Sequence, residues 1–450
     1  MAEHGDEHTV RMKITVKEST MVKPMKETPT ETLWLSNLDL IYTPNYHSRL
    51  VNFYRNDAGA ADFFDAAVMK AALSKALVEF YPIAGRLERG DDGHIVINCN
   101  GEGVQFVEAE CDGAMDELCS FSPSPDISLV PAVDYSKDIS TIPLFLLQLT
   151  RFKCGGVSFS FSNEHHLSDG IASHHFVNVW SEIIRGRITA PTAPPLLDRR
   201  VLSARNPPQP TFPHIEHQPP QSLKIPLSVS GDTTFSTFRL SPHQINALKQ
   251  QCVDDKIRYS TFQVLTGHVW RCASIARGLA EDQETRLRFS VDGRQKLRPP
   301  LPESYLGNGI FYTVASALCG QLKSNPLKFA VGKVREAIDR IDNDYMGSAL
   351  DYMELHQRIG KGVLLRKGNL NCPNLGITNW IRLPFNKMDF GWGKPVYTGP
   401  GAAVIEGRSY LFADLGNEGC IMLAISLYSE HMERFEKLFH HVVIQNSVHN

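Results

Sequence analysis

The chain is predicted to be a mixed α/β protein built from two lobes. Its 450 residues exceed what one compact core usually holds, which favours two domains. Segments with helical spacing of apolar residues alternate with strand-like runs in both halves, as expected for an α/β class. Ten prolines fall within residues 191–228. Prolines at this density disfavour helices and central strands, so we expect an extended connector there.

The first lobe, residues 1–190, is expected to contain two helices and four strands. Apolar residues recur at helical spacing from Asp65 to Phe80, and Asp65 is a suitable N-cap. A second helix is expected over residues 172–184, with Gly186 as its C-terminal cap. The expected strands cover residues 94–98, 104–107, 144–152 and 157–161.

The second lobe, residues 229–450, repeats this mixture. We expect its strands to converge with those of the first lobe near the interface between the lobes. The expected helices cover residues 241–250, 260–277 and 430–442, and the expected strands cover residues 287–291, 309–317 and 420–427.

The composition excludes several classes of function. Hydrophobic residues make up 42% and charged residues 21% of the chain, the balance of a soluble globular protein. A net charge of −3 without a dense Lys/Arg run disfavours a nucleic-acid partner. The first twenty residues lack an apolar core, and no apolar run is long enough to cross a bilayer. We therefore expect a cytoplasmic protein without an integral membrane segment.

The nine cysteines are well separated along the sequence. They form neither a Cys-x-x-Cys pair nor a Cys/His cluster with zinc spacing, so no metal site is expected. Unpaired cysteines in a reducing compartment usually behave as small hydrophobic residues. This interpretation agrees with a cytoplasmic location.

One segment stands out for its chemistry: residues 165–170 read His-His-Leu-Ser-Asp-Gly. A histidine at the end of a buried strand can hold one ring nitrogen toward a cavity and act as a general base near neutral pH. The same segment also fits an ordinary turn, in which Asp169 caps the next helix and Gly170 supplies an unusual dihedral angle. Taken alone, the segment leaves both interpretations open.

A second segment, Asp389-Phe390-Gly391-Trp392-Gly393, predicts a tight loop. Two glycines around a tryptophan suit neither a helix nor a strand, and the aspartate suits backbone hydrogen bonds within the loop. This pattern by itself favours a structural loop over a catalytic one.

Together the two segments resemble the signature of the BAHD family of plant acyl-CoA-dependent acyltransferases. The resemblance covers nearly the whole chain, and further family signatures lie at residues 19–24, 33–37, 80–87, 267–271 and 291–294. A closer similarity, to the hydroxycinnamoyl-CoA shikimate/quinate branch and its rosmarinic acid synthase relatives, is carried by residues 98–103, 205–210 and 372–380.

This resemblance implies a chloramphenicol acetyltransferase-like fold, with two lobes of similar size and a channel between them. It implies transfer of a coumaroyl or caffeoyl group from CoA to the hydroxyl of a small acid such as shikimate, quinate or a hydroxyphenyllactate-type acceptor. The implied partners are hydroxycinnamoyl-CoA and that acceptor. Acyl-CoA would be a co-substrate, with no resident cofactor, and the protein is expected to be a monomer.

The resemblance also assigns roles at the reacting centre. His165 matches the base that deprotonates the acceptor hydroxyl. Trp380 matches a tryptophan whose indole N–H points toward the developing oxyanion, although a core indole is an equal alternative. Asp389 matches a loop-holding residue to which a proton-handling role is sometimes assigned. Asp169 and Arg294 match a structural pair beside the site.

Four more residues match substrate-binding positions of the family. His47 and Thr378 correspond to positions on the acceptor side. Ser260 and Thr261 fall where the family contacts the pantetheine arm of CoA. Ser-Thr before a helical run is also an ordinary N-cap, so the second pair of assignments has a structural alternative.

The carboxylate-binding position departs from the pattern of the shikimate branch. Arg366 is the best match to the arginine that grips the acceptor carboxylate there, but the length of its segment is shifted by one residue. Lys367 is the fallback, and an arginine fork and a lysine point charge would not grip a carboxylate equally well. The acceptor is therefore left open.

Three alternatives remain at this point. Glu164 is an acidic residue beside the His-containing segment, and acidic groups would suit an amine or polyamine acceptor. Peptide-condensation and transacetylase relatives share a similar segment, but the condensation spacing is one residue longer than in this chain. A non-catalytic binding protein on the same fold is disfavoured because His165, Asp169 and Arg294 are all present.

Overall fold

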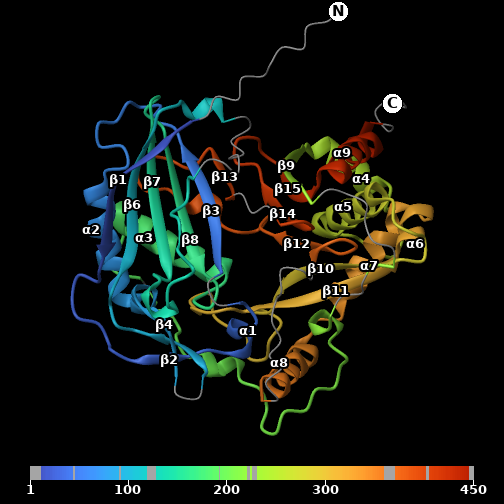
Figure 1. Cartoon of the computed structure of the whole chain (residues 1–450), viewed down its shortest axis with the longest axis horizontal. Coiled ribbons are helices and arrows are strands. Elements are labelled where there is room, and N and C mark those ends of the chain that lie inside the picture. Colours follow the sequence, from blue (N-terminus) through green and yellow to red (C-terminus); the bar gives the residue numbers. More distant parts are fainter. Residues whose placement is uncertain are drawn as a thin grey trace, which may run out of the picture.

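Two large β-sheets form the centres of two lobes, which lie side by side in Figure 1. Each of these sheets has six strands, and a third sheet has three short strands. The mixed α/β class and the two-lobed architecture predicted from the sequence are confirmed. The computed structural model describes residues 12–43, 46–90, 93–118, 128–191, 193–219, 223–224, 231–358, 370–401 and 405–444.

The first sheet receives strands from both ends of the chain. In spatial order its strands are β1 (Ile14–Val22), β6 (Val104–Cys111), β7 (Phe145–Phe152), β8 (Val157–Glu164), β3 (His47–Tyr54) and β13 (Tyr397–Pro400). All neighbouring pairs are antiparallel except β6 and β7. Because β13 belongs to the second half of the sequence but pairs with β3, this strand ties the two halves of the chain together.

Two helices, α2 (Ala66–Glu79) and α3 (Gly170–Ile184), pack against the first sheet. Trp180 of α3 meets Phe159 of β8 edge-on, with 5.5 Å between the ring centroids. The Trp180 indole also donates a hydrogen bond of 3.1 Å to the Met69 carbonyl of α2. Burial of such large aromatic rings supplies much of the hydrophobic stabilisation of this lobe.

The second sheet contains a parallel centre. Its strands, in spatial order, are β11 (Ile310–Leu318), β10 (Glu284–Asp292), β12 (Leu375–Asn379), β14 (Arg408–Ala413), β15 (Ile421–Tyr428) and β9 (Thr233–Leu240). The three central strands β10, β12 and β14 run parallel to one another. Side chains at matching register on these strands therefore share one face of the sheet.

Helices cover the second sheet on the side away from the first lobe (Figure 1). They are α4 (Pro242–Gln250), α5 (Thr261–Arg277), α6 (Cys319–Ser324), α7 (Leu327–Asp339) and α9 (Ser429–Ile444). The central helix α5 is buried along most of its length, in one hydrophobic cluster with residues of α7 and α9.

Smaller elements complete the fold. Short 3-10 turns occur at Tyr81–Ala84, Met115–Glu117, Ile139–Thr141, Arg199–Leu202, Ile215–His217 and Phe385–Lys387. The remaining strands and helices are β2 (Thr32–Trp34), β4 (Arg86–Arg89), β5 (Ile95–Asn98), α1 (Asn37–Leu40) and α8 (Asn343–Arg358). A hydrogen bond of 2.8 Å from the Asn37 side chain to Glu354 links α1 to α8.

All helices and strands expected from the sequence are present, although several are longer than expected. Asp65 caps α2 by accepting the Val68 N–H at 2.9 Å, as its position predicts. The elements that the sequence did not reveal are β1, β2, β3, β4, β9, β12, β13, β14, α1, α6, α7 and α8. Several of these strands have only three to five residues, and apolar periodicity carries little information over so short a length.

The described part of the 191–228 segment is anchored to α8 by a buried polar cluster. The Ser348 hydroxyl accepts the backbone N–H groups of Thr211 and Phe212 at 2.8 and 3.1 Å. It also lies 2.8 Å from Nε2 of His214, whose Nδ1 is 2.9 Å from Glu216. These contacts give a segment with little regular structure a defined path along α8.

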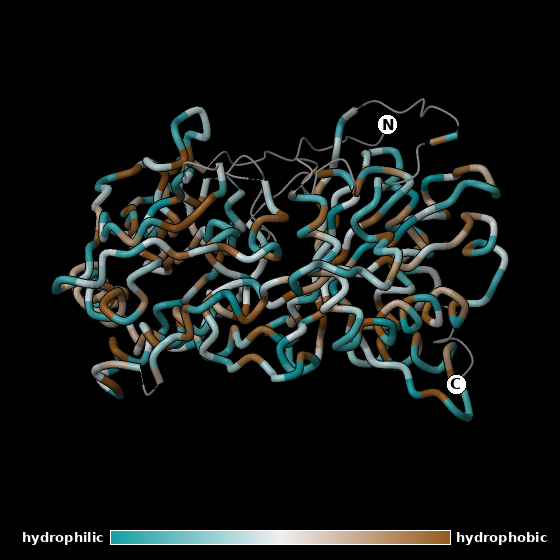
Figure 2. Tube along the Cα trace, turned by 90° about the horizontal axis from the view of Figure 1, so that it is seen from below, coloured by the Kyte–Doolittle hydropathy of each residue, from teal (hydrophilic) through white to brown (hydrophobic). Residues whose placement is uncertain are grey.

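Hydrophobic and hydrophilic segments are distributed through both lobes in Figure 2, and many of the outer loops are hydrophilic. None of the helices within the described ranges is long and apolar enough to cross a membrane. The eight cysteines that lie in those ranges are all unpaired thiols, as expected from their spacing.

Candidate active site

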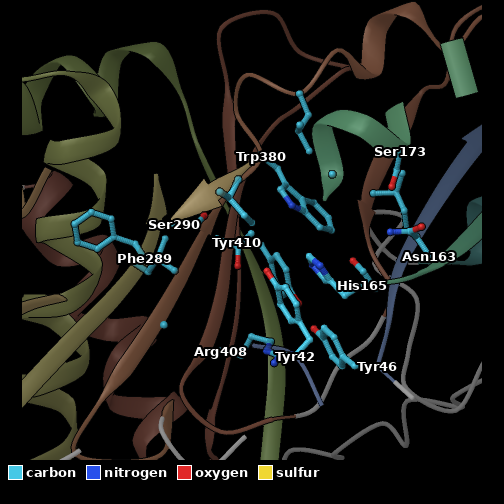
Figure 3. Close-up of a pocket in the computed structure, with 18 of the residues that line it drawn as sticks. Tyr42, Tyr46, Asn163, His165, Ser173, Phe289, Ser290, Trp380, Arg408 and Tyr410 are labelled. Atoms are coloured by element: carbon cyan, nitrogen blue, oxygen red, sulfur yellow. The ribbon is translucent and has the colours of Figure 1, made fainter. Parts of the chain in front are cut away.

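A pocket opens between the two large sheets, and both lobes contribute to its wall (Figure 3). The first lobe supplies the segment before β3, the end of β8 and the start of α3, while the second supplies β10, β11, β12 and β14. The wall includes two arginines, Arg288 and Arg408, and none of the lining residues that the structure describes is acidic. The pocket therefore has a positive lining beside His165.

His165 lies where β8 ends, with its imidazole near the centre of the pocket in Figure 3. Its backbone N–H donates to the Tyr46 carbonyl at 3.0 Å, which fixes the chain as it leaves the strand. Its Nδ1 atom lies 3.2 Å from Oδ1 of Asn308. Among the described residues, no group forms a hydrogen bond with Nε2, so this nitrogen is available to a substrate.

The orientation of the Asn308 amide determines which nitrogen of His165 carries the proton. The Asn308 NH₂ group donates to a carboxylate oxygen of Asp39 and to the His165 carbonyl, both at 2.7 Å. Because both of these partners are acceptors, Oδ1 must face the imidazole and accept from Nδ1–H. The neutral ring then has its lone pair on Nε2, as a general base requires.

Two tyrosine rings hold the imidazole in place. Tyr42 stacks on His165 with 3.8 Å between ring centroids and 17° between planes, and Tyr46 lies at 5.8 Å and 13°. Burial among these groups lowers the pKa of His165 below its ordinary value, although Asp169 and Glu164 partly offset the effect. The ring is therefore neutral, and able to accept a proton, at neutral pH.

Trp380 and Thr378 also line the pocket, and Figure 3 shows the Trp380 ring near His165. Both are on or beside β12, and Trp380 is held by a hydrogen bond of 2.8 Å from its backbone N–H to the Leu411 carbonyl. Its indole ring packs against Tyr410 with centroids 4.8 Å apart. No acceptor for the indole N–H occurs among the described residues, so this donor is free to meet a bound molecule.

Asp169 and Arg294 form a buried ion pair behind the pocket. The two guanidinium nitrogens of Arg294 donate to the Asp169 carboxylate at 2.8 and 3.0 Å. Asp169 also caps α3, accepting the N–H groups of Ile171 and Ala172 at 3.1 and 3.0 Å. Burial alone would raise the pKa of Asp169, but Arg294 and these donors hold it below its ordinary value. The pair thus fixes both the lobe contact and the turn that carries His165.

Asp389 lies in its loop rather than in the pocket wall. Its carboxylate accepts the N–H groups of Gly391 and Gly393 at 2.9 and 3.1 Å, and both glycines have positive φ angles. Phe390 packs among the aromatic rings of the first lobe, with 5.2 Å between its ring centroid and that of Trp180. These contacts dock the loop onto the face of the first lobe that is covered by α3.

Three other substrate-binding assignments, His47, Ser260 and Thr261, are not part of the lining of this pocket. Both ring nitrogens of His47 are occupied, one 3.1 Å from the Tyr135 hydroxyl and the other 3.0 Å from the Pro143 carbonyl. Ser260 is the N-cap of α5, accepting the Gln263 N–H, and Thr261 is the first residue of that helix. Arg366 and Lys367 lie outside the described residues.

Glu164 does not supply an acidic group to the pocket. It is 2% exposed, and its carboxylate lies 2.9 Å from Nδ1 of His166. Burial opposes ionisation of both groups, but their mutual attraction raises the pKa of His166 and lowers that of Glu164. The second histidine of the motif is thus committed to this buried pair.

Several residues of the pocket were not singled out from the sequence. They are Tyr42, Tyr46, Arg288, Ser290, Arg408 and Tyr410. Asn308, which contacts His165 from outside the pocket lining, was not singled out either. Arg288 had a weak signal, because it places a charge inside a strand-like run, between Leu287 and Phe289. Arg408 had no such signal, because it begins β14 directly after Glu406 and Gly407. Asn308 had no signal in the sequence, since its contact with His165 forms only where the two lobes pack together.

The chain was then compared with known proteins. A family model described as the Transferase family matches residues 12–442. The chain belongs to this family, the BAHD acyltransferases, which use acyl-CoA as donor. Vinorine synthase, a solved structure of 20% sequence identity, has the same fold with a TM-score of 0.71 over 96% of this chain and 98% of the other.

Two relatives are similar along their full length. Rosmarinate synthase from Plectranthus scutellarioides is 51% identical over 96% of this chain and 100% of its own. Shikimate O-hydroxycinnamoyltransferase from Nicotiana tabacum is 50% identical over 95% of this chain and 100% of its own. Such identity over whole chains agrees with membership of the BAHD family, as the resemblance of its motifs implies.

Proposed function

We propose that this BAHD acyltransferase moves a hydroxycinnamoyl group from CoA to the hydroxyl of a small acid. The observation that carries this proposal is the unoccupied Nε2 of His165, aimed into a pocket whose wall also holds the free indole N–H of Trp380. The names of the relatives support hydroxycinnamoyl-CoA as donor and acids such as shikimate as acceptors. Quinate and hydroxyphenyllactate-type acids belong to the same acceptor class.

The reaction needs two proton transfers, one from the acceptor hydroxyl to His165 and one from His165 to the departing thiolate of CoA. Nε2 of His165 takes the proton of the acceptor hydroxyl as its oxygen attacks the thioester carbonyl. The carbonyl oxygen becomes an oxyanion, which accepts the Trp380 indole N–H in the tetrahedral intermediate. Collapse of this intermediate breaks the C–S bond, and the imidazolium returns its proton to the departing CoA thiolate. The thioester is already activated, so acyl-CoA serves as a co-substrate and no resident cofactor takes part.

The electrostatics of the pocket favour an acid over an amine as acceptor. The described part of the lining holds Arg288 and Arg408 and no Asp or Glu, and Glu164 is buried against His166. A positively charged amine would be repelled by this wall, whereas a carboxylate would be attracted to it. The alternative of an N-hydroxycinnamoyltransferase acting on a polyamine therefore lacks the acidic groups that it requires.

The residues proposed to bind the acyl donor, CoA, lie at the start of α5. We propose that Ser260 and Thr261, at the exposed start of this helix, contact the pantetheine arm of CoA. A helix N-terminus presents free N–H groups, and these favour polar or anionic ligands. Arg366 remains a predicted contact of the acceptor carboxylate, and Asp389 is assigned to holding its loop.

The central test measures release of free CoA thiol from coumaroyl-CoA. We expect release with wild-type protein only when an acceptor acid is added, and an ester product by mass spectrometry. The His165→Ala variant should lose about a hundredfold to ten-thousandfold in kcat, the usual contribution of a general base, while still binding coumaroyl-CoA. Normal turnover in this variant would remove His165 from the mechanism.

The same assay separates the remaining alternatives. An amide product from a panel of amines, with no ester from acids, would favour an N-acyltransferase. A non-catalytic binding protein would bind coumaroyl-CoA without releasing thiol with any acceptor. We also propose that the protein is a cytoplasmic monomer, which light scattering of the purified protein and imaging of a fluorescent fusion would test.

A further inference from the structure

Arg288 is a buried cation that lacks an anionic partner. Its side chain is 8% exposed and lines the pocket, and its Nε and one terminal nitrogen have no hydrogen-bond partner within the described residues. Its guanidinium carbon lies 4.5 Å from the centroid of the Tyr312 ring, which offers a cation–π contact but no charge. A buried charge without a counter-charge is costly, so this site is set up to receive one.

Arg408 is a second cation in the same wall. One of its terminal nitrogens donates to the Tyr46 hydroxyl at 2.8 Å, and its guanidinium carbon lies 5.3 Å from the centroid of the Tyr46 ring. Within the described ranges, no carboxylate forms an ion pair with Arg408 or with Arg288. Two positive charges therefore face the pocket without compensation.

The two arginines occupy one row of the second sheet. Arg288 on β10 is in register with Gly376 on β12, and Gly376 is in register with Arg408 on β14. Their side chains share the face that lines the pocket, and their strands are separated by one strand, about 10 Å from Cα to Cα. Gly376 between them has no side chain, and the described atoms nearest to it on this face belong to Leu370.

Polar groups follow the arginine row in order along the strands. Two residues further on each strand come Ser290, Thr378 and Tyr410, three hydroxyl-bearing residues that all line the pocket. Trp380 comes next on the β12 side. The wall thus passes from two cations, through three hydroxyls, to the indole proposed to meet the oxyanion, and this order suits an acceptor with charged groups at the end remote from the reacting hydroxyl.

The surrounding tyrosines do not neutralise the arginines. Burial raises the pKa values of Tyr42, Tyr312 and Tyr410, so their hydroxyls stay uncharged at neutral pH. Glu216 acts on Arg288 from a longer distance, but its two oxygens already accept from His214 and Tyr345. No other described group supplies the missing negative charge, and we assign it to a bound molecule.

We propose that Arg288 and Arg408 form a clamp for an acceptor that carries two carboxylates, so that the acceptor class is a short hydroxy dicarboxylic acid. This inference rests on the proposed transfer to a hydroxyl and narrows its acceptor. Each guanidinium takes one carboxylate, while the hydroxyl of the acid reaches Nε2 of His165. A monocarboxylic acid would leave one of the two cations uncompensated.

The test compares two acceptors that differ only in the second carboxylate. Malate and lactate each carry a hydroxyl beside one carboxylate, and shikimate serves as a larger monocarboxylic acid. With coumaroyl-CoA as donor, we expect wild-type protein to show a kcat/KM for malate about tenfold to a hundredfold above that for lactate or shikimate, as one charge-assisted contact provides. This comparison uses only wild-type protein, so it tests the preference for a second carboxylate even if a variant fails to fold.

Variants identify the residues responsible. Arg288→Met and Arg408→Met should each lower kcat/KM for malate about tenfold to a hundredfold and abolish the preference of malate over lactate. Arg239→Met is the matched control, because Arg239 is an exposed arginine on the edge strand β9 of the same sheet, and it should leave both acceptors unchanged. Thermal unfolding checks that each variant is folded.

The outcomes separate this inference from the proposed function. Thiol release with shikimate or lactate at least as efficient as with malate would overturn the two-carboxylate clamp while leaving the acyl transfer standing. A preference for malate that persists in both variants would overturn the assignment to Arg288 and Arg408. Absence of thiol release with every acceptor would overturn the proposed function and the clamp together.

Discussion

The Nδ1 atom of His165 lies 3.2 Å from the Oδ1 atom of Asn308, although the two residues are 143 positions apart in the sequence and belong to different lobes. The backbone N–H of Asn308 donates to Asp39 at 3.0 Å, in addition to the two bonds of its side-chain NH₂ group. Three donated hydrogen bonds leave the amide no freedom to reverse. The base is therefore set in one tautomer by a residue that is not part of the pocket lining.

Replacement of this amide tests the tautomer directly. Asn308→Ala should lower kcat about tenfold to a hundredfold, because the neutral ring can then carry its proton on either nitrogen and is less firmly oriented. The KM for coumaroyl-CoA should change little, since Asn308 does not line the pocket. Steady-state kinetics across pH separate this effect from a loss of folded protein, and Asn417→Ala, in an exposed turn, is the matched control. An unchanged kcat would show that Asn308 does not position the base.

The pH dependence of turnover follows from the lowered pKa of His165. Burial shifts this pKa below the ordinary value of 6.5, so the ring stays neutral as pH falls to 6.5 and becomes protonated only below it. We expect kcat/KM to be level from neutral pH down to about 6.5 and then to fall with a slope of one proton. A pH–rate profile measured with a saturating acceptor would contradict this assignment if its acidic limb were centred above 6.5.

The Asp169–Arg294 pair should matter more for stability than for chemistry. Asp169→Asn keeps an oxygen for the cap of α3 but leaves the Arg294 charge without its partner, which costs about 3–5 kcal/mol at a buried site. Asp292→Asn is the matched control, because Asp292 also contacts Arg294 but is 44% exposed, and it should cost less than about 1 kcal/mol. Urea unfolding of both variants measures the difference. Equal losses in the free energy of unfolding would show that burial of the Asp169–Arg294 pair does not increase its contribution to stability.

Ser348 offers a test of how the connecting segment is held. Ser348, His214 and Glu216 have the bonding order of a catalytic triad, but each is at most 3% exposed, so no substrate can reach the hydroxyl. Ser348→Ala should destabilise the protein by about 1–3 kcal/mol for each buried group left unpaired, without changing kcat of the folded protein. Thermal and urea unfolding measure this loss, with Ser140→Ala at an exposed position as control. A variant as stable as the wild type would show that the cluster does not anchor the segment.

Only part of the local structure was readable from the sequence. Apolar spacing and caps such as Asp65 and Ser260 predicted helices α2 and α5, because these signals lie within a few residues of one another, whereas α7 and α8 were missed. The short strands were not predictable, since a segment such as β13 is defined by its pairing with β3 rather than by its own residues. Of the candidate site, His165, Trp380 and Thr378 were found from motifs and do line one pocket.

The sequence by itself thus determined the two-lobed α/β class, the family, and the histidine proposed as base. The tertiary structure decided the arrangement around that histidine: Asn308 at Nδ1 of the ring, Asp389 away from the pocket, and Arg288 and Arg408 in the pocket wall. The physical reason is that these relationships arise where strands and loops from distant parts of the chain pack together. A residue's charge is visible in the sequence, but whether that charge is buried, paired or left for a ligand depends on its neighbours in space.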